Sequence, residues 1–190
     1  MIFLITGLVL FIGVHSVAIV MPQWRERMLA QHGEARWKGI YSLLAIVGVV
    51  LIVYGYGEAR QQPTLLYATP VWMRHVTALL MLPVFPLLLA AYFPGKIQAA
   101  LKHPMLAGLK LWAFAHLLSN GMLADVILFG ALLAWAIADR ISLKRRPPKR
   151  IPQAGAPSAR NDVIAVVLGL VIYVAFAFRL HFWLIGIPIA

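Results

Sequence analysis

The stretch that decides the fold is residues 103–140, which read HPMLAGLKLWAFAHLLSNGMLADVILFGALLAWAIADR. It is an apolar run that contains His116 and Asp125 and is interrupted by Ser119-Asn120-Gly121. An ionisable side chain at membrane depth is costly, and it usually marks a pathway, a ligand site or a buried pair. We therefore expect the function of the chain to be found in or beside this stretch.

The composition around this stretch is that of a polytopic membrane protein. Hydrophobic residues make up 62% of the 190 residues and charged residues 12%, whereas soluble domains average about 45–50% and about 25%. The absence of cysteine excludes disulfides, thiolate-ligated haem and cysteine-bound iron–sulfur clusters. Residues 1–21 lack a basic start and a small-residue cleavage site, so we expect them to stay in place as a transmembrane helix.

Long apolar runs give the membrane spans. About 20 apolar residues cross a bilayer, and four runs qualify directly: 2–21, 39–57, 70–93 and 162–178. Basic residues cluster in the loops 25–38, 96–110 and 140–160, which the positive-inside rule places in the cytoplasm. The net charge of +11 is then explained by loops that face anionic lipid, and we expect no nucleic-acid partner.

Charge balance divides the 103–140 stretch into two arms. One helix over its whole length would be about 50 Å long and would put two basic loops on opposite sides of the membrane. A hairpin that turns at Ser119-Asn120-Gly121 avoids both problems. The predicted fold is therefore an all-α membrane bundle of about six transmembrane helices, in which a short fourth helix from Pro104 pairs with the fifth in a hairpin.

Three further features complete the predicted organisation, which is one membrane domain over residues 1–190. The Met21–Trp37 segment should form a short interfacial helix. Pro83 and Pro86 should kink the third span and open space for a bound group. Residues 140–160, rich in proline and basic residues, should be a flexible cytoplasmic linker.

Two histidines lie inside the predicted spans at similar depth. His15 follows Phe11 by one turn in the first span, and His116 follows Trp112 by one turn in the short arm. Each imidazole could simply hydrogen-bond a carbonyl or a serine across a helix contact. On helices that are free to pack together, the pair could instead hold a haem by its axial positions.

Other polar residues have local explanations. His103 should cap the short arm, which proline starts at its first position. Asp125 and Arg74 lie at matched depth and should form an ion pair, which satisfies two costly charges. Four aromatic residues near helix ends are typical of an interfacial belt: Tyr54, Tyr56, Trp72 and Tyr92.

The run from His103 to Trp135 resembles the NnrU family of bacterial membrane proteins, and the opening GLVLFIGVHS and closing HFWLIG agree with it. That family is associated with nitrite and nitric-oxide metabolism in denitrifiers. The NnrU family is in turn similar to the 15-cis-zeta-carotene isomerase, a membrane enzyme that contains haem b. The ligand histidines of that enzyme correspond to His15, before Ser16, and to His116. Ala113 stands where the isomerase carries a cysteine implicated in redox-dependent ligand exchange.

A second, more distant similarity concerns the start of the short arm. His103-Pro104 and the next residues look like the cofactor region of isoprenylcysteine-type methyltransferases, where histidine contacts S-adenosylmethionine. Lys102 and Leu106 depart from that pattern, and the later acidic and arginine elements are missing. A complete methyltransferase site is therefore not expected.

Together the residues and the resemblance predict a protein of the bacterial inner membrane that binds haem b. His15 and His116 would be the axial iron ligands, with Phe11, Trp112 and His103 near the cofactor. Membrane lipid, denitrification enzymes or a redox partner are the expected partners. The alternatives are a methyltransferase-like enzyme that uses S-adenosylmethionine, a carotenoid-type isomerase, and a non-catalytic membrane assembly partner.

Overall fold

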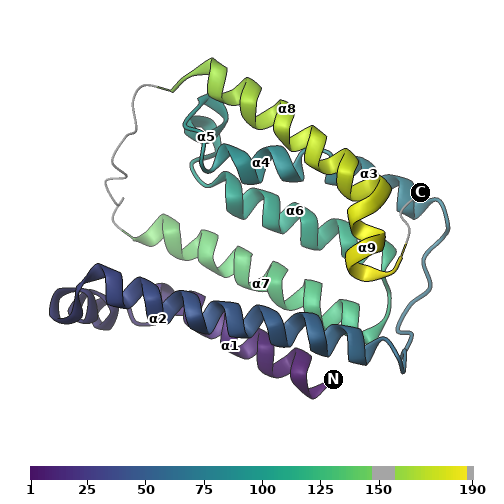
Figure 1. Cartoon of the computed structure of the whole chain (residues 1–190), viewed down its shortest axis with the longest axis horizontal. Helices are drawn as coiled ribbons and strands as arrows, with labels where there is room; N and C mark the ends of the chain where they lie inside the picture. The colour runs from purple at the N-terminus through teal and green to yellow at the C-terminus, as the bar shows by residue number, and fades with distance from the viewer. Residues whose placement is uncertain (147–156, 188–190) are drawn as a thin grey trace. The chain divides into compact units, whose positions relative to one another are not determined.

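The computed structural model describes residues 1–146 and 157–187, and its long elements in these ranges are all helices (Figure 1). Five helical stretches are long and apolar enough to cross a membrane: Ile2–Val20, Pro22–Ala59, Met73–Ala90, Leu123–Arg145 and Ala159–Ile185. Large apolar side chains stay exposed along them, for example Val50 at 59% and Val171 at 60%. The predicted all-α, multi-pass membrane fold is confirmed.

The helix boundaries follow from local sequence. Helix α1 (Ile2–Val20) ends before Pro22, which starts α2 (Pro22–Ala59). Gly33 adopts φ 79° and ψ 160°, so α2 consists of a short helix and a long one joined at a kink. Only glycine adopts that backbone conformation without a steric penalty. The short helix predicted before the second span is therefore present.

Proline divides the third span, as the sequence predicts. Helix α3 (Met73–Met81) stops just before Pro83, and α4 (Val84–Ala90) begins just after it. The amide of Leu82 bonds to the carbonyl of Leu79 rather than to that of Ala78, so the Ala78 carbonyl loses its helical partner. In lipid such a group must find another donor within the protein.

The short arm is α6 (Pro104–Ser119), which has 16 residues and follows α5 (Lys96–Leu101). The chain leaves the helix at Asn120 and starts α7 (Leu123–Arg145) three residues later. Both the break and the short length were predicted. The prediction that residues 140–160 form a linker was wrong for its first residues, because α7 continues to Arg145; residues 147–156 lie outside the described part.

The chain divides into two compact units. Unit 1 comprises Met1–Leu66 and Met122–Ser142, and unit 2 comprises Tyr67–Gly121 and Leu143–Ala190. Helix α6 belongs to unit 2 and nearly all of α7 to unit 1. The predicted pairing of these two arms, and the predicted single domain, therefore stay predictions.

In unit 1, α1 and α2 lie in close contact along a seam of glycines. A Cβ on Gly7 would lie 2.6 Å from the backbone N of Ile52, and one on Gly48 would lie 3.0 Å from Cβ of Phe11. Gly55 faces the backbone of Leu4 even more closely. Small residues let backbones approach in lipid, where helices associate by packing and hydrogen bonds rather than by the hydrophobic effect.

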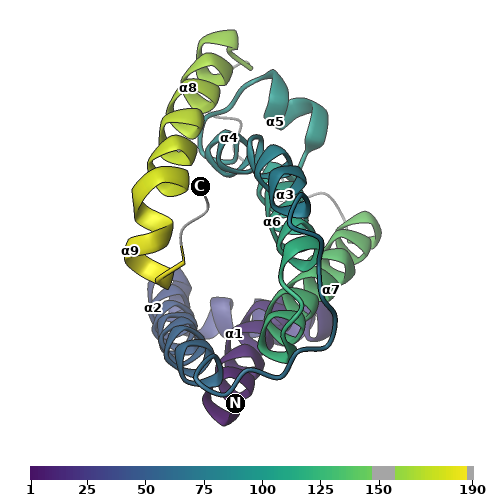
Figure 2. The same ribbon diagram turned by 90° about the vertical axis from the view of Figure 1, so that its right-hand side faces the viewer.

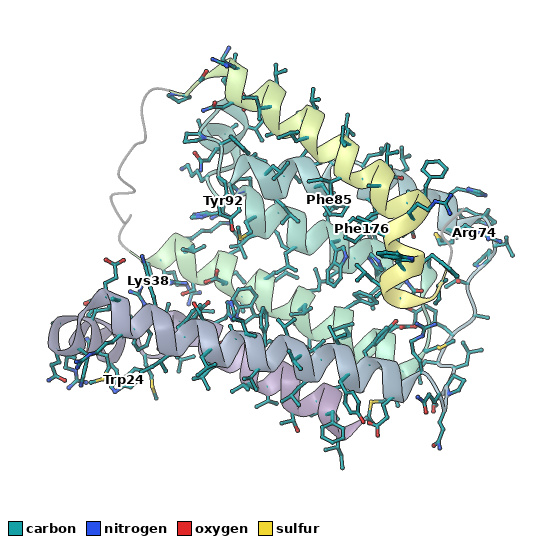
Figure 3. All side chains as sticks on the ribbon, viewed as in Figure 1. Trp24, Lys38, Arg74, Phe85, Tyr92 and Phe176 are labelled. Atoms are coloured by element: carbon teal, nitrogen blue, oxygen red, sulfur yellow. The ribbon has the colours of Figure 1, made fainter. Side chains whose placement is uncertain are left out.

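In unit 2, α4 lies between α6 and α8 (Ala159–Ala175), as Figures 1 and 2 show. Gly169 of α8 faces the backbone of Pro86, and Tyr173 donates a hydrogen bond of 3.0 Å to the Ala78 carbonyl that the α3–α4 break releases. The last span continues through a π-helical turn, η1 (Phe176–Leu180), into α9 (His181–Ile185). The rings of Phe85 and Phe176 are in contact near this turn (Figure 3).

Candidate functional site

His15 lies on α1 in unit 1, one turn before the end of that helix. Its Nδ1 is 2.7 Å from the carbonyl oxygen of Phe11. Because a carbonyl oxygen can only accept, Nδ1 carries the proton and donates it, and the lone pair of the neutral ring lies on Nε2. The Phe11 ring lies 4.2 Å from the imidazole, measured between centroids, and supports its orientation.

Two further aromatic rings reach His15 from other helices of unit 1. The ring of Tyr41, on α2, lies 5.0 Å away, and that of Trp135, on α7, lies 5.6 Å away at an interplanar angle of 82°. The His15 site is defined here as His15, Phe11, Tyr41 and Trp135, which come from three helices. Sequence reasoning missed Tyr41 and Trp135, because neither is close to His15 in the chain.

His116 lies in the last turn of α6 in unit 2, and its local arrangement repeats that of His15. Its Nδ1 donates to the carbonyl of Trp112 at 2.8 Å, and the two rings lie 5.1 Å apart. The helix ends directly after it, since the backbone and side-chain amides of Asn120 both bond to the His116 carbonyl at 2.9 Å. The imidazole is therefore placed by its own helix and by the turn that follows.

The carbonyls at the end of α6 are satisfied by two side chains from the segment before α3. Thr69 donates to the Ser119 carbonyl at 3.2 Å, and the Tyr67 hydroxyl donates to the carbonyls of Leu117 and Asn120. The last carbonyls of a helix have no partner within it, and in a membrane water cannot replace one. These bonds explain how a 16-residue helix can end among other helices.

His103 occupies the cap position of α6, as predicted, with Pro104 at the first helical position. Its carbonyl accepts the amide of Ala107 at 3.2 Å, which is the first bond of the helix. This local role accounts for the His-Pro pair. A contact of His103 with a cofactor stays a prediction.

Asp125 is buried, with 4% of its surface exposed. Because it belongs to unit 1 and Arg74 to unit 2, the predicted ion pair between them stays a prediction. The carboxylate accepts the Tyr56 hydroxyl at 2.6 Å and the backbone amide of Met122 at 3.1 Å. Within unit 2, Arg74 donates to the carbonyl of Val71.

The position of Asp125 in α7 explains this arrangement. As the third residue of the helix, its carboxylate reaches back to the amide of the residue before the helix, which is one half of a capping box. The positive end of the helix dipole favours a negative charge there. Tyr56, assigned from sequence to the aromatic belt, is thus a half-buried hydrogen-bond donor to Asp125.

Among the described residues, no group of three or more histidine, cysteine, aspartate or glutamate side chains could hold a metal ion. A haem needs at most two protein ligands, because the porphyrin supplies four. His15 belongs to unit 1 and His116 to unit 2, so their joint ligation of one iron stays a prediction.

Comparison with known proteins gives the family. A model of the NnrU protein family matches residues 3–189, which is nearly the whole chain. The chain belongs to the NnrU family, and the resemblance predicted from its sequence is confirmed. No curated protein and no solved structure gives a significant match.

Proposed function

We propose that this multi-pass membrane protein binds haem b through the imidazoles of His15 and His116 and uses it for electron transfer or redox sensing. The resemblance described above links this activity to nitrite and nitric-oxide metabolism in the bacterial inner membrane. The basic loops would then face the cytoplasm.

The observation that supports the proposal is the matching arrangement of the two histidines. Each donates from Nδ1 to the carbonyl one turn earlier, at 2.7 Å for His15 and 2.8 Å for His116. Metal-ligating histidines almost always donate their second ring nitrogen in this way, which fixes the tautomer and makes the ligand more basic. Both imidazoles therefore carry the lone pair on Nε2, the nitrogen that would bind iron.

The neighbouring side chains suit a porphyrin. Phe11 and Trp112 each lie one turn before a histidine and contact its ring, so each imidazole is held between its own helix and an aromatic face. Burial in apolar surroundings is one of the means by which a protein sets the potential of a haem. When bound, haem would supply one-electron chemistry, and ligation by two imidazoles suits electron transfer because both axial positions are filled.

The test is the absorption spectrum of the purified protein, oxidised and reduced, in the wild type and in two variants. We expect a Soret band in the wild type and sharp bands on reduction. His15→Ala and His116→Ala should each lose most of the haem or convert the rest to a five-coordinate spectrum. The matched control is His32→Ala, since His32 is an exposed histidine of the same protein.

Two results would refute the proposal. One is a wild type, expressed with sufficient haem supply, that has no Soret band and takes up no added haem. The other is haem content that neither variant changes. Heat released on adding S-adenosylmethionine, and lost in His103→Ala, would instead support the methyltransferase-like alternative.

The physiological role is tested separately, in a denitrifying host that lacks its own copy of the gene. Complementation with the wild type should restore nitrite and nitric-oxide turnover, and complementation with His15→Ala should not. Full complementation by a variant that carries alanine at both histidines would favour the alternative of an assembly partner without a cofactor.

A further inference from the structure

The indole N–H of Trp135 is a buried hydrogen-bond donor that finds no acceptor within the described part of the chain. Its indole nitrogen Nε1 is fully buried and has no hydrogen-bond partner among the described residues. A buried donor without an acceptor is destabilising, because it has lost its hydrogen bond to water without replacing it. Such a group in a native protein requires an explanation, and a missing ligand is one of the few available.

Among the described residues, no atom accepts a hydrogen bond from the Trp135 indole. The ring lies 5.6 Å from that of His15, whose Nδ1 already donates to the Phe11 carbonyl. An indole N–H can only donate. An acceptor carried by a ligand at the His15 site would satisfy it.

We propose that the indole N–H of Trp135 donates a hydrogen bond to a propionate carboxylate of the haem b held at His15. This inference rests on the proposed function. Iron occupies the pyrrole nitrogens of haem b, so its two carboxylates are the only hydrogen-bond acceptors on the rest of the macrocycle. A carboxylate at this depth needs donors because burial without them is costly, and a hydrogen bond to an ionised acceptor is about twice as strong as one between neutral groups.

The fold gives Trp135 a position suited to this role. It comes from α7, whereas His15 comes from α1, so the iron ligand and the carboxylate donor would hold the cofactor from two different helices. Two fixed points define the rotation of the porphyrin about the iron–histidine axis, which one axial ligand leaves free. Trp135 would act as a positioning residue for haem, without contact to the iron.

The test compares two cofactors in two proteins. Apo-protein in detergent is titrated with protohaem and with its dimethyl ester, in which both carboxylates are blocked. Wild type should bind protohaem about tenfold more tightly than Trp135→Phe does, as expected for the loss of a hydrogen bond to a charged group. The dimethyl ester offers only neutral carbonyl oxygens, which are weaker acceptors than a carboxylate, so the two proteins should differ in affinity for it by about threefold or less.

Controls separate the hydrogen bond from packing. Trp183→Phe, at a residue that is 86% exposed, should leave both affinities unchanged. If Trp135→Phe does not fold, replacing Trp135 with 3-benzothienylalanine keeps the ring shape and removes only the N–H. Equal affinity of the wild type and the variant for protohaem would overturn the inference, as would an equal loss for both cofactors. If the wild type binds neither cofactor, it is the haem proposal that fails, and this one with it.

Discussion

The close contact between α1 and α2 at the glycines of unit 1 predicts the effect of adding one methyl group, by the substitution Gly55→Ala. Gly55 is buried against α1, and a Cβ there would lie 2.6 Å from the carbonyl carbon of Phe3 and 2.8 Å from Cα of Leu4. Both neighbours are backbone atoms, which cannot rotate away. For Gly55→Ala to fit, the gap to Phe3 must open from 2.6 Å to at least 3.4 Å, so α1 must move by at least about 0.8 Å.

The energetic cost of this shift can be set against the gain from alanine. A gap of 0.5–1 Å forfeits about a quarter to a half of each dispersion contact, and overpacking of a close contact costs about 1–3 kcal/mol. Alanine returns up to about 1 kcal/mol of helix propensity relative to glycine. We expect a net loss of about 1–2 kcal/mol in the free energy of unfolding, or roughly a 5- to 30-fold change in the equilibrium constant.

The matched control is Gly57, two residues further along the same helix. It is exposed and a Cβ there meets nothing within 4 Å. Gly57→Ala should therefore be neutral or stabilising by up to about 1 kcal/mol. Both variants are unfolded at equilibrium in mixtures of dodecyl maltoside and SDS and followed by circular dichroism. The reasoning is refuted if Gly55→Ala resists SDS as well as Gly57→Ala does.

Two carboxylates give further predictions. Tyr56→Phe removes the 2.6 Å hydrogen bond to the buried carboxylate of Asp125, and it should lower the free energy of unfolding by about 1.5–3 kcal/mol in the same assay. The control Tyr54→Phe, at a residue that is 60% exposed, should change the free energy of unfolding little. Equal losses in the two variants would contradict the role assigned to Tyr56. Asp162→Asn replaces a carboxylate that accepts the first two amides of α5 at 2.8 and 3.0 Å by a group with one acceptor oxygen. Hydrogen exchange should then accelerate in α5 and stay unchanged in α6, and protection of α5 at the wild-type level would refute this capping role.

Much of the fold could be predicted because it depends on local signals. Proline at the first position of α6, the polar break after it and the apolar run of α7 each act within a few residues, and the structure has all three. Pro83 divides the third span for the same reason. The basic residues predict which loops face the cytoplasm. That orientation is defined relative to the membrane, so it remains a prediction.

Most of the missed contacts join residues far apart in the chain. Sequence reasoning gave Asp125 a charged partner, and the structure gives its carboxylate two neutral hydrogen-bond donors. The capping position of Asp125 was visible in the sequence, three residues after Met122, but Tyr56 as second donor was not. Tyr41 and Trp135 reach His15 from separate helices, and no spacing within the chain encodes that.

Two of the carboxylates are already used as hydrogen-bond acceptors at the N-termini of helices. The sequence has only six, and the buried Asp125 is used to start α7 while Asp162 is used to start α5. Both therefore supply negative charge to helix N-termini, where the first amides have no partner within the helix. A carboxylate committed to two donors is poorly suited to move protons or bind a cation. Two other polar side chains of the spans are His15, whose lone pair lies on Nε2, and Trp135, whose indole N–H has no acceptor among the described residues. One is a potential metal ligand and the other a hydrogen-bond donor, and the proposed haem b would use both, because it combines an iron with carboxylates.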